Sequence, residues 1–252
     1  MRTIYKKILL NREANRKMLA VLIDPDQCRG SVLAGTVAML KSYTPDFIFV
    51  GGSHMLTASV DSLIGLLKDE VKTNVVLFPG NAAQFSVHAD ALLYLSLLSG
   101  RNAEFLVGQH LTSALAIKNS NIEVVPTGYL LIDGGKPSSV EYISNTRPIP
   151  RDKNEIALST AVAGELLGMR LIYLEAGSGA EIPVPLEMIE CVSAGLSLPL
   201  IVGGGIKTTE QLSAAFDAGA DIVVVGNVFE KDPSRIAEFV QCVQSLQYNQ
   251  SN

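Results

Sequence analysis

Short apolar segments rich in Val, Ile and Leu recur along the chain, and each ends in glycine, proline or a polar residue. Most are followed by a segment in which apolar residues recur at helical spacing, an alternation typical of β-strand and α-helix units. The strand segments are apolar almost throughout, which indicates parallel strands that are buried on both faces. The pattern predicts eight strands, at residues 19–24, 46–50, 74–78, 91–95, 122–126, 171–175, 199–203 and 222–225.

Eight such strands predict an α/β fold, a closed TIM barrel of the (β/α)8 type. The connection at residues 79–90 is short for a full helix, so we expect a modified or missing third helix. Residues 127–152 contain several Gly and Pro residues and predict a long ordered loop after strand five. Helices are predicted at residues 31–42, 56–70, 101–119, 153–168, 183–195, 208–218 and 230–246.

The composition fits one globular domain over residues 1–252, because 48% of the residues are hydrophobic and 18% are charged. A formal net charge of −5, with both signs dispersed, argues against nucleic-acid binding. The three cysteines have no metal-ligand or disulfide spacing and indicate a reducing, cytoplasmic location. No apolar run approaches the roughly 20 residues of a membrane span, so we expect at most transient contact with a membrane surface.

Glycines end the last two predicted strands. Gly203, Gly204 and Gly205 follow one strand, and Gly226 and Asn227 follow the other. In (β/α)8 enzymes the loops after strands seven and eight often bind a phosphate, because bare backbone N–H groups can approach the anion. The alternative is that these glycines only close tight turns, but their pairing at two neighbouring strands favours phosphate binding.

A carboxylate ends the predicted strand six. Tyr173 and Glu175 are two residues apart and so face the same way along a strand. Glu175 could accept a proton from a substrate hydroxyl, and the Gly177-Ser178-Gly179 turn could hold polar ligand atoms. The alternatives are a salt-bridged structural carboxylate at Glu175 and a packing role for Tyr173.

Oxygen ligands follow strands one and two. Asp24 ends the first, and Ser53 follows the second; both suit Mg²⁺, which completes its coordination with water and substrate phosphate. Asp26 could instead cap the first helix or support Asp24, and Ser53 could cap the second helix. The three histidines, His54, His88 and His110, lack zinc-ligand spacing and are interpreted as structural or peripheral.

Similar residues in the same order occur in the geranylgeranylglyceryl phosphate synthase family, which includes the heptaprenylglyceryl phosphate synthases. The chain resembles this family over nearly its whole length, and the Tyr-Leu-Glu-Ala-Gly-Ser-Gly and Asp-Pro-Asp blocks are the most specific. The motifs are Ile-Asp-Pro-Asp at 23–26, Val-Gly-Gly-Ser at 50–53, Pro-Thr-Gly-Tyr at 126–129, the block at 167–180, Val-Gly-Gly-Gly-Ile at 202–206 and Gly-Asn-Val at 226–228. One departure is Leu22, because archaeal members of the family often carry a basic residue near that position.

The resemblance implies a prenyltransferase that joins a prenyl diphosphate, most simply geranylgeranyl diphosphate, to the 3-hydroxyl of sn-glycerol 1-phosphate. It assigns Mg²⁺ to Asp24 and Ser53, proton acceptance to Glu175, and a homo-oligomer of unspecified size. It implies that glycerol 1-phosphate is bound by Tyr173, Leu174, Glu175, Ala176, Gly177, Ser178, Gly179, Gly204, Gly205, Gly226 and Asn227. Candidates for lining an apolar prenyl groove, which could equally be core residues, are Phe78, Phe85, Leu92, Tyr94 and Tyr129.

Two other functions share the phosphate motifs. A phosphosugar isomerase or synthase barrel would carry the same glycines, but it offers no reason for Asp-Pro-Asp opposite Gly-Gly-Ser. A non-catalytic barrel that binds a phosphorylated metabolite would give binding without turnover, since fold alone does not fix function.

Overall fold

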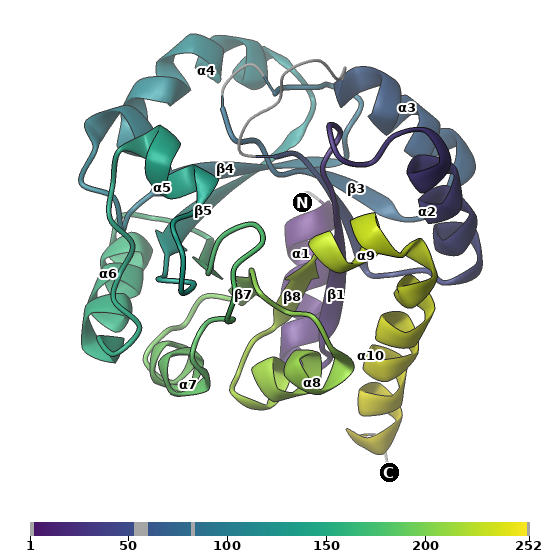
Figure 1. Cartoon of the computed structure of the whole chain (residues 1–252). Coiled ribbons are helices and arrows are strands. Elements are labelled where there is room, and N and C mark those ends of the chain that lie inside the picture. Colours follow the sequence, from purple (N-terminus) through teal and green to yellow (C-terminus); the bar gives the residue numbers. More distant parts are fainter. Residues whose placement is uncertain (1–2, 53–59, 82–83, 251–252) are drawn as a thin grey trace. The chain divides into compact units, whose positions relative to one another are not determined.

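A computed structural model describes residues 3–52, 60–81 and 84–250 (Figure 1). Eight parallel strands form a closed barrel in chain order, as predicted. The strands are β1 (Met18–Ile23), β2 (Phe47–Val50), β3 (Asn74–Leu77), β4 (Ala91–Leu97), β5 (Glu123–Leu131), β6 (Leu171–Glu175), β7 (Leu200–Gly203) and β8 (Ile222–Val225).

Helices alternate with most of these strands along the chain. They are α1 (Thr3–Glu13), α2 (Gly30–Ser42), α3 (Val60–Glu70), α4 (Gln109–Asn119), α5 (Ser139–Ser144), α6 (Asn154–Leu166), α7 (Leu186–Ala194), α8 (Thr209–Asp217), α9 (Asn227–Lys231) and α10 (Ile236–Gln250). A π-helical turn at Glu104–Gly108 leads into α4, and a 3₁₀ turn at Pro233–Arg235 leads into α10. Within the described part of the β3–β4 connection, residues 78–81 and 84–90, no helix forms, and the predicted modification of the third helix is confirmed.

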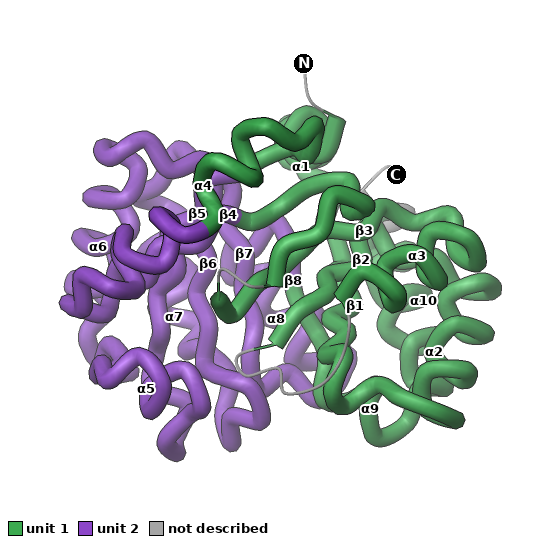
Figure 2. Tube along the Cα trace, turned by 90° about the horizontal axis from the view of Figure 1, so that it is seen from above, with its two compact units in different colours: residues 1–93, 113–124, 224–252 green, residues 94–112, 125–223 purple. Residues whose placement is uncertain are grey.

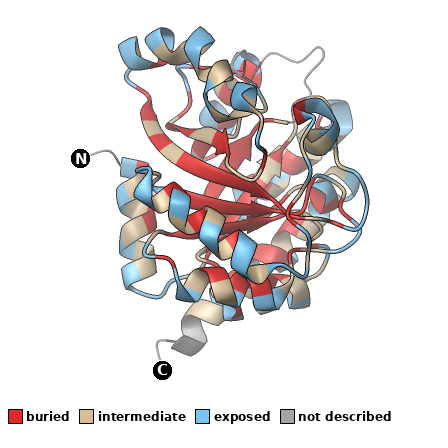
Figure 3. Ribbon diagram, turned by 90° about the vertical axis from the view of Figure 1, so that its left-hand side faces the viewer, coloured by how far each residue is buried: buried red, intermediate tan, exposed pale blue. Residues whose placement is uncertain are grey.

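The chain divides into two compact units (Figure 2). The first comprises residues 1–93, 113–124 and 224–252, and the second comprises residues 94–112 and 125–223. The strands are buried along almost their whole length, whereas the helices carry exposed residues (Figure 3). This burial explains why the strand segments are apolar without alternation.

In the first unit, the ends of β1, β2 and β3 are aligned by their register. Ile23 pairs with Val50, and Val50 pairs with Leu77. Large side chains such as Phe47 and Phe49 are buried beneath them, and each contributes about 2 kcal/mol through removal of apolar surface from water. The residues that follow the three strands are therefore brought close together.

The N-terminal helix α1 was not predicted from the sequence. Its first turn is held by the buried carboxylate of Glu123, which accepts hydrogen bonds from the backbone N–H groups of Ile4 at 2.8 Å and Tyr5 at 3.0 Å. A carboxylate at a helix N-terminus satisfies unpaired donors and opposes the positive end of the helix dipole. The partner lies more than 100 residues away, so no local pattern could reveal it.

In the second unit, β5 continues to Leu131, so the prediction of a loop from residue 127 was wrong for its first five residues. Gly128 pairs with Ile172 of β6. A Cβ on Gly128 would lie 2.7 Å from Cδ1 of Leu98 and 2.8 Å from Cδ1 of Ile172. The glycine therefore allows close packing inside a strand, whereas its sequence pattern alone indicates a loop. The short helix α5 also interrupts the predicted loop.

The predicted helix at 230–246 is two helices. Helix α9 ends at Lys231, and Pro233 begins the 3₁₀ turn before α10. Proline lacks an N–H group and is favoured at the start of a helix, which accounts for the break. No helix among the described residues is long and apolar enough to cross a membrane.

Candidate active site

Strand β6 places Tyr173 and Glu175 on the same face, and Leu174 between them points to the other face. All three side chains are buried. The ring of Tyr173 packs against the ring of Tyr129 from the neighbouring strand β5, with centroids 5.4 Å apart. Tyr129, a candidate for the prenyl groove, is thus packed beside the predicted base.

The carboxyl group of Glu175 is enclosed by backbone. It is 6% exposed, and Oε1 accepts a hydrogen bond from the N–H of Gly177 at 2.7 Å. Burial raises the pKa of Glu175 to about 7, against hydrogen bonds from Tyr173 and Gly177 that lower it. Among the described residues Glu175 forms no ion pair, so it is not the salt-bridged structural carboxylate of the alternative reading. A carboxyl group with a pKa near neutrality is suited to proton transfer.

The turn after β7 closes over this carboxyl group. Gly204 has a φ of +81°, and a Cβ there would clash with Oε1 of Glu175 and lie 2.8 Å from the backbone nitrogen of Gly177. A Cβ on Gly203 would lie 2.9 Å from Oε2 of Glu175. Glycine is therefore required at Gly204 for both conformation and space.

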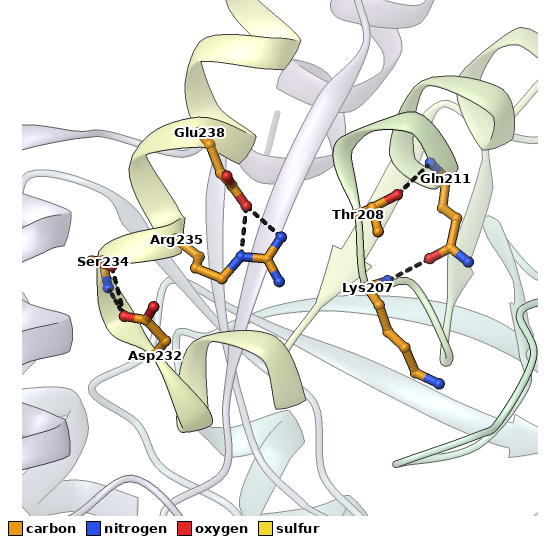
Figure 4. Close-up of polar contacts among 7 residues, drawn as sticks. All are labelled: Lys207, Thr208, Gln211, Asp232, Ser234, Arg235 and Glu238. Atoms are coloured by element: carbon orange, nitrogen blue, oxygen red, sulfur yellow. Dashed lines mark hydrogen bonds and ion pairs between the residues drawn. The ribbon is translucent and has the colours of Figure 1, made fainter.

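Helix α8 begins directly after this turn (Figure 4). Thr208 is the N-cap residue, and its hydroxyl accepts the backbone N–H of Gln211 at 3.3 Å. The side chain of Gln211 in turn accepts the backbone N–H of Lys207 at 2.7 Å. Helix α8 confirms the helix predicted at residues 208–218, and its N-cap fixes the end of the glycine turn.

The Gly177–Gly179 turn is packed against the segment that follows β5. The carbonyl of Gly134 accepts the N–H of Glu181 at 3.0 Å, and Nζ of Lys136 lies 3.8 Å from the place of a Cβ on Gly179. Sequence reasoning missed Lys136. Its position after a predicted barrel strand was the signal that could have identified it.

Arg151 joins two segments beside the same turn, and it was also missed. Its guanidinium donates to the carbonyl of Asp133 at 2.7 Å and to the carbonyl of Pro183 at 2.9 Å. These bonds hold the start of the β5–α5 connection to the segment before α7. A cavity of about 190 Å³ beside Arg151 is lined mainly by apolar side chains from the segment before α7, from β7 and the turn after it, and from α7 and α8.

In the first unit, Gly226 and Asn227 lie at the start of α9. A Cβ on Gly226 would lie 3.2 Å from Cβ of Leu22, so Leu22 packs against the start of α9. This apolar residue stands where a basic residue is expected in archaeal members of the family. The amide of Asn227 donates to Glu230 at 3.0 Å. Beyond α9, Asp232 accepts the N–H of Ser234, and Arg235 pairs with Glu238 at the beginning of α10 (Figure 4).

Asp24 lies where β1 ends, half-buried against the Gly51–Gly52 backbone. Its Oδ1 accepts the N–H of Asp26 at 2.8 Å, and burial raises its pKa. Asp26 does not cap α2: the N-cap residue is Arg29, with which Asp26 forms an ion pair. The backbone N–H of Asp26 thus holds the Asp24 carboxylate in place. Of the two roles considered for Asp26, capping the helix or supporting Asp24, the structure shows the second.

The predicted Mg²⁺ site has one candidate ligand, Asp24, among the described residues. Ser53, the second predicted ligand, and His54 lie outside the described residues. Among the residues that are described, no three His, Cys, Asp or Glu side chains gather in a way that could hold a metal ion. Asp24 thus needs further ligands from water or substrate to bind Mg²⁺, as is usual for this ion.

The second unit therefore assembles Tyr173 to Gly179 with Gly203, Gly204 and Gly205, and the first unit contains Asp24, Gly226 and Asn227. Of the predicted groove residues, Leu92 is buried, Phe78 and Phe85 are half-buried, and Tyr94 stacks on His110 with centroids 4.2 Å apart. None of these groove assignments is tested by the contacts observed.

A family model described as the PcrB family matches residues 12–243. The chain belongs to the PcrB family. The geranylgeranylglyceryl phosphate synthase of Chitinophaga pinensis is 48% identical, over 96% of this chain and 96% of that protein. The synthase of Thermococcus kodakarensis is 44% identical, over 85% of each chain. The resemblance predicted from the sequence is thereby confirmed.

A solved synthase structure is also similar to this chain. The crystal structure of (S)-3-O-geranylgeranylglyceryl phosphate synthase from Thermoplasma acidophilum, in complex with its substrate sn-glycerol 1-phosphate, has a TM-score of 0.88 and 32% identity. The match covers 97% of this chain and 100% of that one. The YdjI aldolase from Escherichia coli K12, at 11% identity and a TM-score of 0.56, shares the fold alone.

Proposed function

We propose that this chain is a Mg²⁺-dependent prenyltransferase of the phosphoglycerol geranylgeranyltransferase type. It joins geranylgeranyl diphosphate to the 3-hydroxyl of sn-glycerol 1-phosphate and releases pyrophosphate. The observation that carries the proposal is the buried Glu175 carboxyl group, with its pKa near 7, beside two glycine turns in a PcrB-family barrel. The related Thermoplasma protein, whose structure contains sn-glycerol 1-phosphate, supports the choice of acceptor.

The acceptor is held by the residues around Glu175. In the second unit, backbone N–H groups of Ser178, Gly179, Gly204 and Gly205 would bind its phosphate and hydroxyl groups. Such groups bind oxyanions without desolvating a lysine or arginine. Fixing the acceptor in this way makes the attack of its hydroxyl effectively intramolecular.

Glu175 accepts the proton of the attacking hydroxyl. The oxygen of the glycerol 3-hydroxyl forms an ether bond to C1 of the prenyl chain, the bond between C1 and the diphosphate oxygen breaks, and the electron pair leaves with pyrophosphate. The group must be ionised to act as a base, so its pKa of about 7 leaves a substantial ionised fraction at neutral pH.

The donor atoms of Asp24 and Ser53 are oxygens, which are the ligands that Mg²⁺ prefers. Asp24 supplies a carboxylate next to a backbone turn without side chains, and Ser53 would supply a hydroxyl. The chemistry gained from a bound Mg²⁺ is neutralisation of charge on the diphosphate as it leaves. Asp24 would hold the cation, and the Gly52 backbone lies beside its carboxylate. A homo-oligomer and a cytoplasmic location are part of the same proposal.

The decisive experiment is product formation by the purified protein with Mg²⁺, radiolabelled sn-glycerol 1-phosphate and prenyl diphosphates of different lengths. We expect an organic-extractable product from the 1-phosphate and none from the sn-glycerol 3-phosphate control, with geranylgeranyl diphosphate as the best donor. EDTA should abolish the product and added Mg²⁺ should restore it. Binding of glycerol 1-phosphate without product from any donor would contradict the proposed activity.

A further inference from the structure

Gln84 lies in the β3–β4 connection, and its carboxamide is buried, with 3% of the residue exposed. Its Nε2 donates to the carbonyl of Gly52 at 2.8 Å, and its Oε1 accepts the N–H of Gly80 at 3.0 Å. The same oxygen lies 3.5 Å from the nitrogen of Gly52. One side chain thus ties the turn after β2 to the turn after β3.

The turn that Gln84 holds is in contact with Asp24. A Cβ on Gly52 would lie 2.6 Å from Oδ2 of Asp24, so the backbone of Gly52 lies beside the carboxylate and leaves no room for a side chain. A shift of this turn would change the space beside the carboxylate.

The other side of this turn is equally confined. The N–H of Gly51 donates to the carbonyl of Ile23 at 3.2 Å, and a Cβ on Gly51 would clash with the carbonyl oxygen of Phe78. The backbone at the ends of β1 and β3 therefore fixes the position of Gly51. The carbonyl of Gly52, one residue further, is instead fixed by the side chain of Gln84.

We propose that Gln84 is a positioning residue for the prenyl diphosphate, acting by holding the Gly51–Gly52 backbone beside Asp24. The inference rests on the proposed function, and it concerns the donor substrate alone. All contacts of Gln84 described above are in the first unit, and Glu175 with its glycine turns is in the second. Loss of Gln84 should weaken binding of the diphosphate and leave binding of glycerol 1-phosphate intact.

The test compares Gln84→Leu, which has similar size and cannot form hydrogen bonds, with Gln247→Leu as a matched control. Gln247 is also in the first unit and also donates a side-chain hydrogen bond to a backbone carbonyl, that of Lys17, at 2.9 Å. Affinities for geranylgeranyl diphosphate with Mg²⁺ and for glycerol 1-phosphate are measured separately by calorimetry, so that turnover is not needed. We expect the diphosphate affinity of Gln84→Leu to fall about tenfold, because misplacement of a binding group weakens the interaction without removing it.

Glycerol 1-phosphate affinity should stay within about twofold in both variants, and the control should bind both substrates normally. In an Asp24→Ala background, Gln84→Leu should cause little further loss, because coupled residues are not additive. Gln84→Asn serves as the second variant where Gln84→Leu does not fold, and its shorter amide should also weaken diphosphate binding.

Unchanged diphosphate affinity, or an equal loss for both substrates, would overturn the role of Gln84. A wild-type protein that binds both substrates normally but forms no product would overturn the proposed activity instead. The two failures are therefore distinguishable.

Discussion

Oε1 of Glu175 accepts a hydrogen bond from the backbone N–H of Gly177 at 2.7 Å, and the same oxygen occupies the space that a Cβ on Gly204 would need. The carboxyl group is held by main chain on two sides and has no cationic partner among the described residues. The pKa of Glu175 is therefore set by burial, and its carboxyl group occupies the space that is left free because residue 204 is a glycine. The first three predictions follow from one or both of these facts.

Replacing Glu175 by Gln should lower turnover by about 10²- to 10⁴-fold, the usual contribution of a positioned general base. The amide keeps the size of the side chain and an oxygen that can accept the Gly177 N–H, so glycerol 1-phosphate affinity should change only a few-fold. Single-turnover rates and calorimetry separate the two effects. Turnover at the wild-type rate would exclude Glu175 as the base.

The pH dependence of stability should also change in Glu175→Gln. Because burial raises the pKa of Glu175 from 4.5 to about 7, the folded state holds a proton that the unfolded chain releases between these values. Relative to the ionised form, the protonated Glu175 stabilises the folded state. This stabilisation is fully present below pH 4.5 and is lost as the pH rises through 7. The resulting penalty above pH 7 is of the order of 3 kcal/mol, and Gln does not incur it.

Urea unfolding at pH 5 and pH 8 measures this difference. The free energy of unfolding of Glu175→Gln relative to wild type should be higher at pH 8 than at pH 5. Equal differences at both pH values would mean that the pKa of Glu175 is not raised in the folded protein.

Gly204→Ala should abolish activity, because the new Cβ clashes with the Glu175 carboxyl group and the backbone has a φ of +81°. Gly168→Ala is the matched control: its φ is +91°, and no atom lies within 4 Å of the new Cβ. Both variants carry a backbone strain of about 1–2 kcal/mol, and only Gly204→Ala displaces the base. Activity and thermal unfolding of the two variants, measured side by side, test the assignment. Equal activities would contradict it.

Asp24→Asn should raise the Mg²⁺ concentration needed for half-maximal activity and weaken prenyl diphosphate binding, because a neutral amide attracts the cation less. Binding of glycerol 1-phosphate should be unchanged. Mg²⁺ titrations of activity and calorimetry with each substrate provide the measurement. An unaltered Mg²⁺ requirement would place the metal elsewhere.

Glu123→Ala should destabilise the protein by about 2 kcal/mol, because two N–H donors of α1 lose their carboxylate acceptor in a buried setting. Glu70→Ala is the control, since Glu70 forms an exposed ion pair with Lys41 that is worth at most about 1 kcal/mol. Urea unfolding of both variants checks the difference. A Glu123→Ala variant as stable as the control would show that α1 is held by its apolar contacts alone.

The sequence by itself predicted the eight strands and the (β/α)8 class, and it identified Glu175 and the glycine turns as candidate site residues. Buried parallel strands appear as continuous apolar runs, and turns that approach a ligand or another backbone appear as glycines. Both signals are local. They are visible without knowing which segments meet.

Only the tertiary structure decided the features that depend on distant partners. Gly128 continues a strand because Leu98 and Ile172 occupy the space beside it, α1 is held by Glu123, and Gln84 holds Gly52 from the neighbouring strand end. The raised pKa of Glu175 likewise comes from enclosure by segments far along the chain. Which distant segment contacts a given residue depends on how the chain folds, so the partner has no signature in the sequence around that residue.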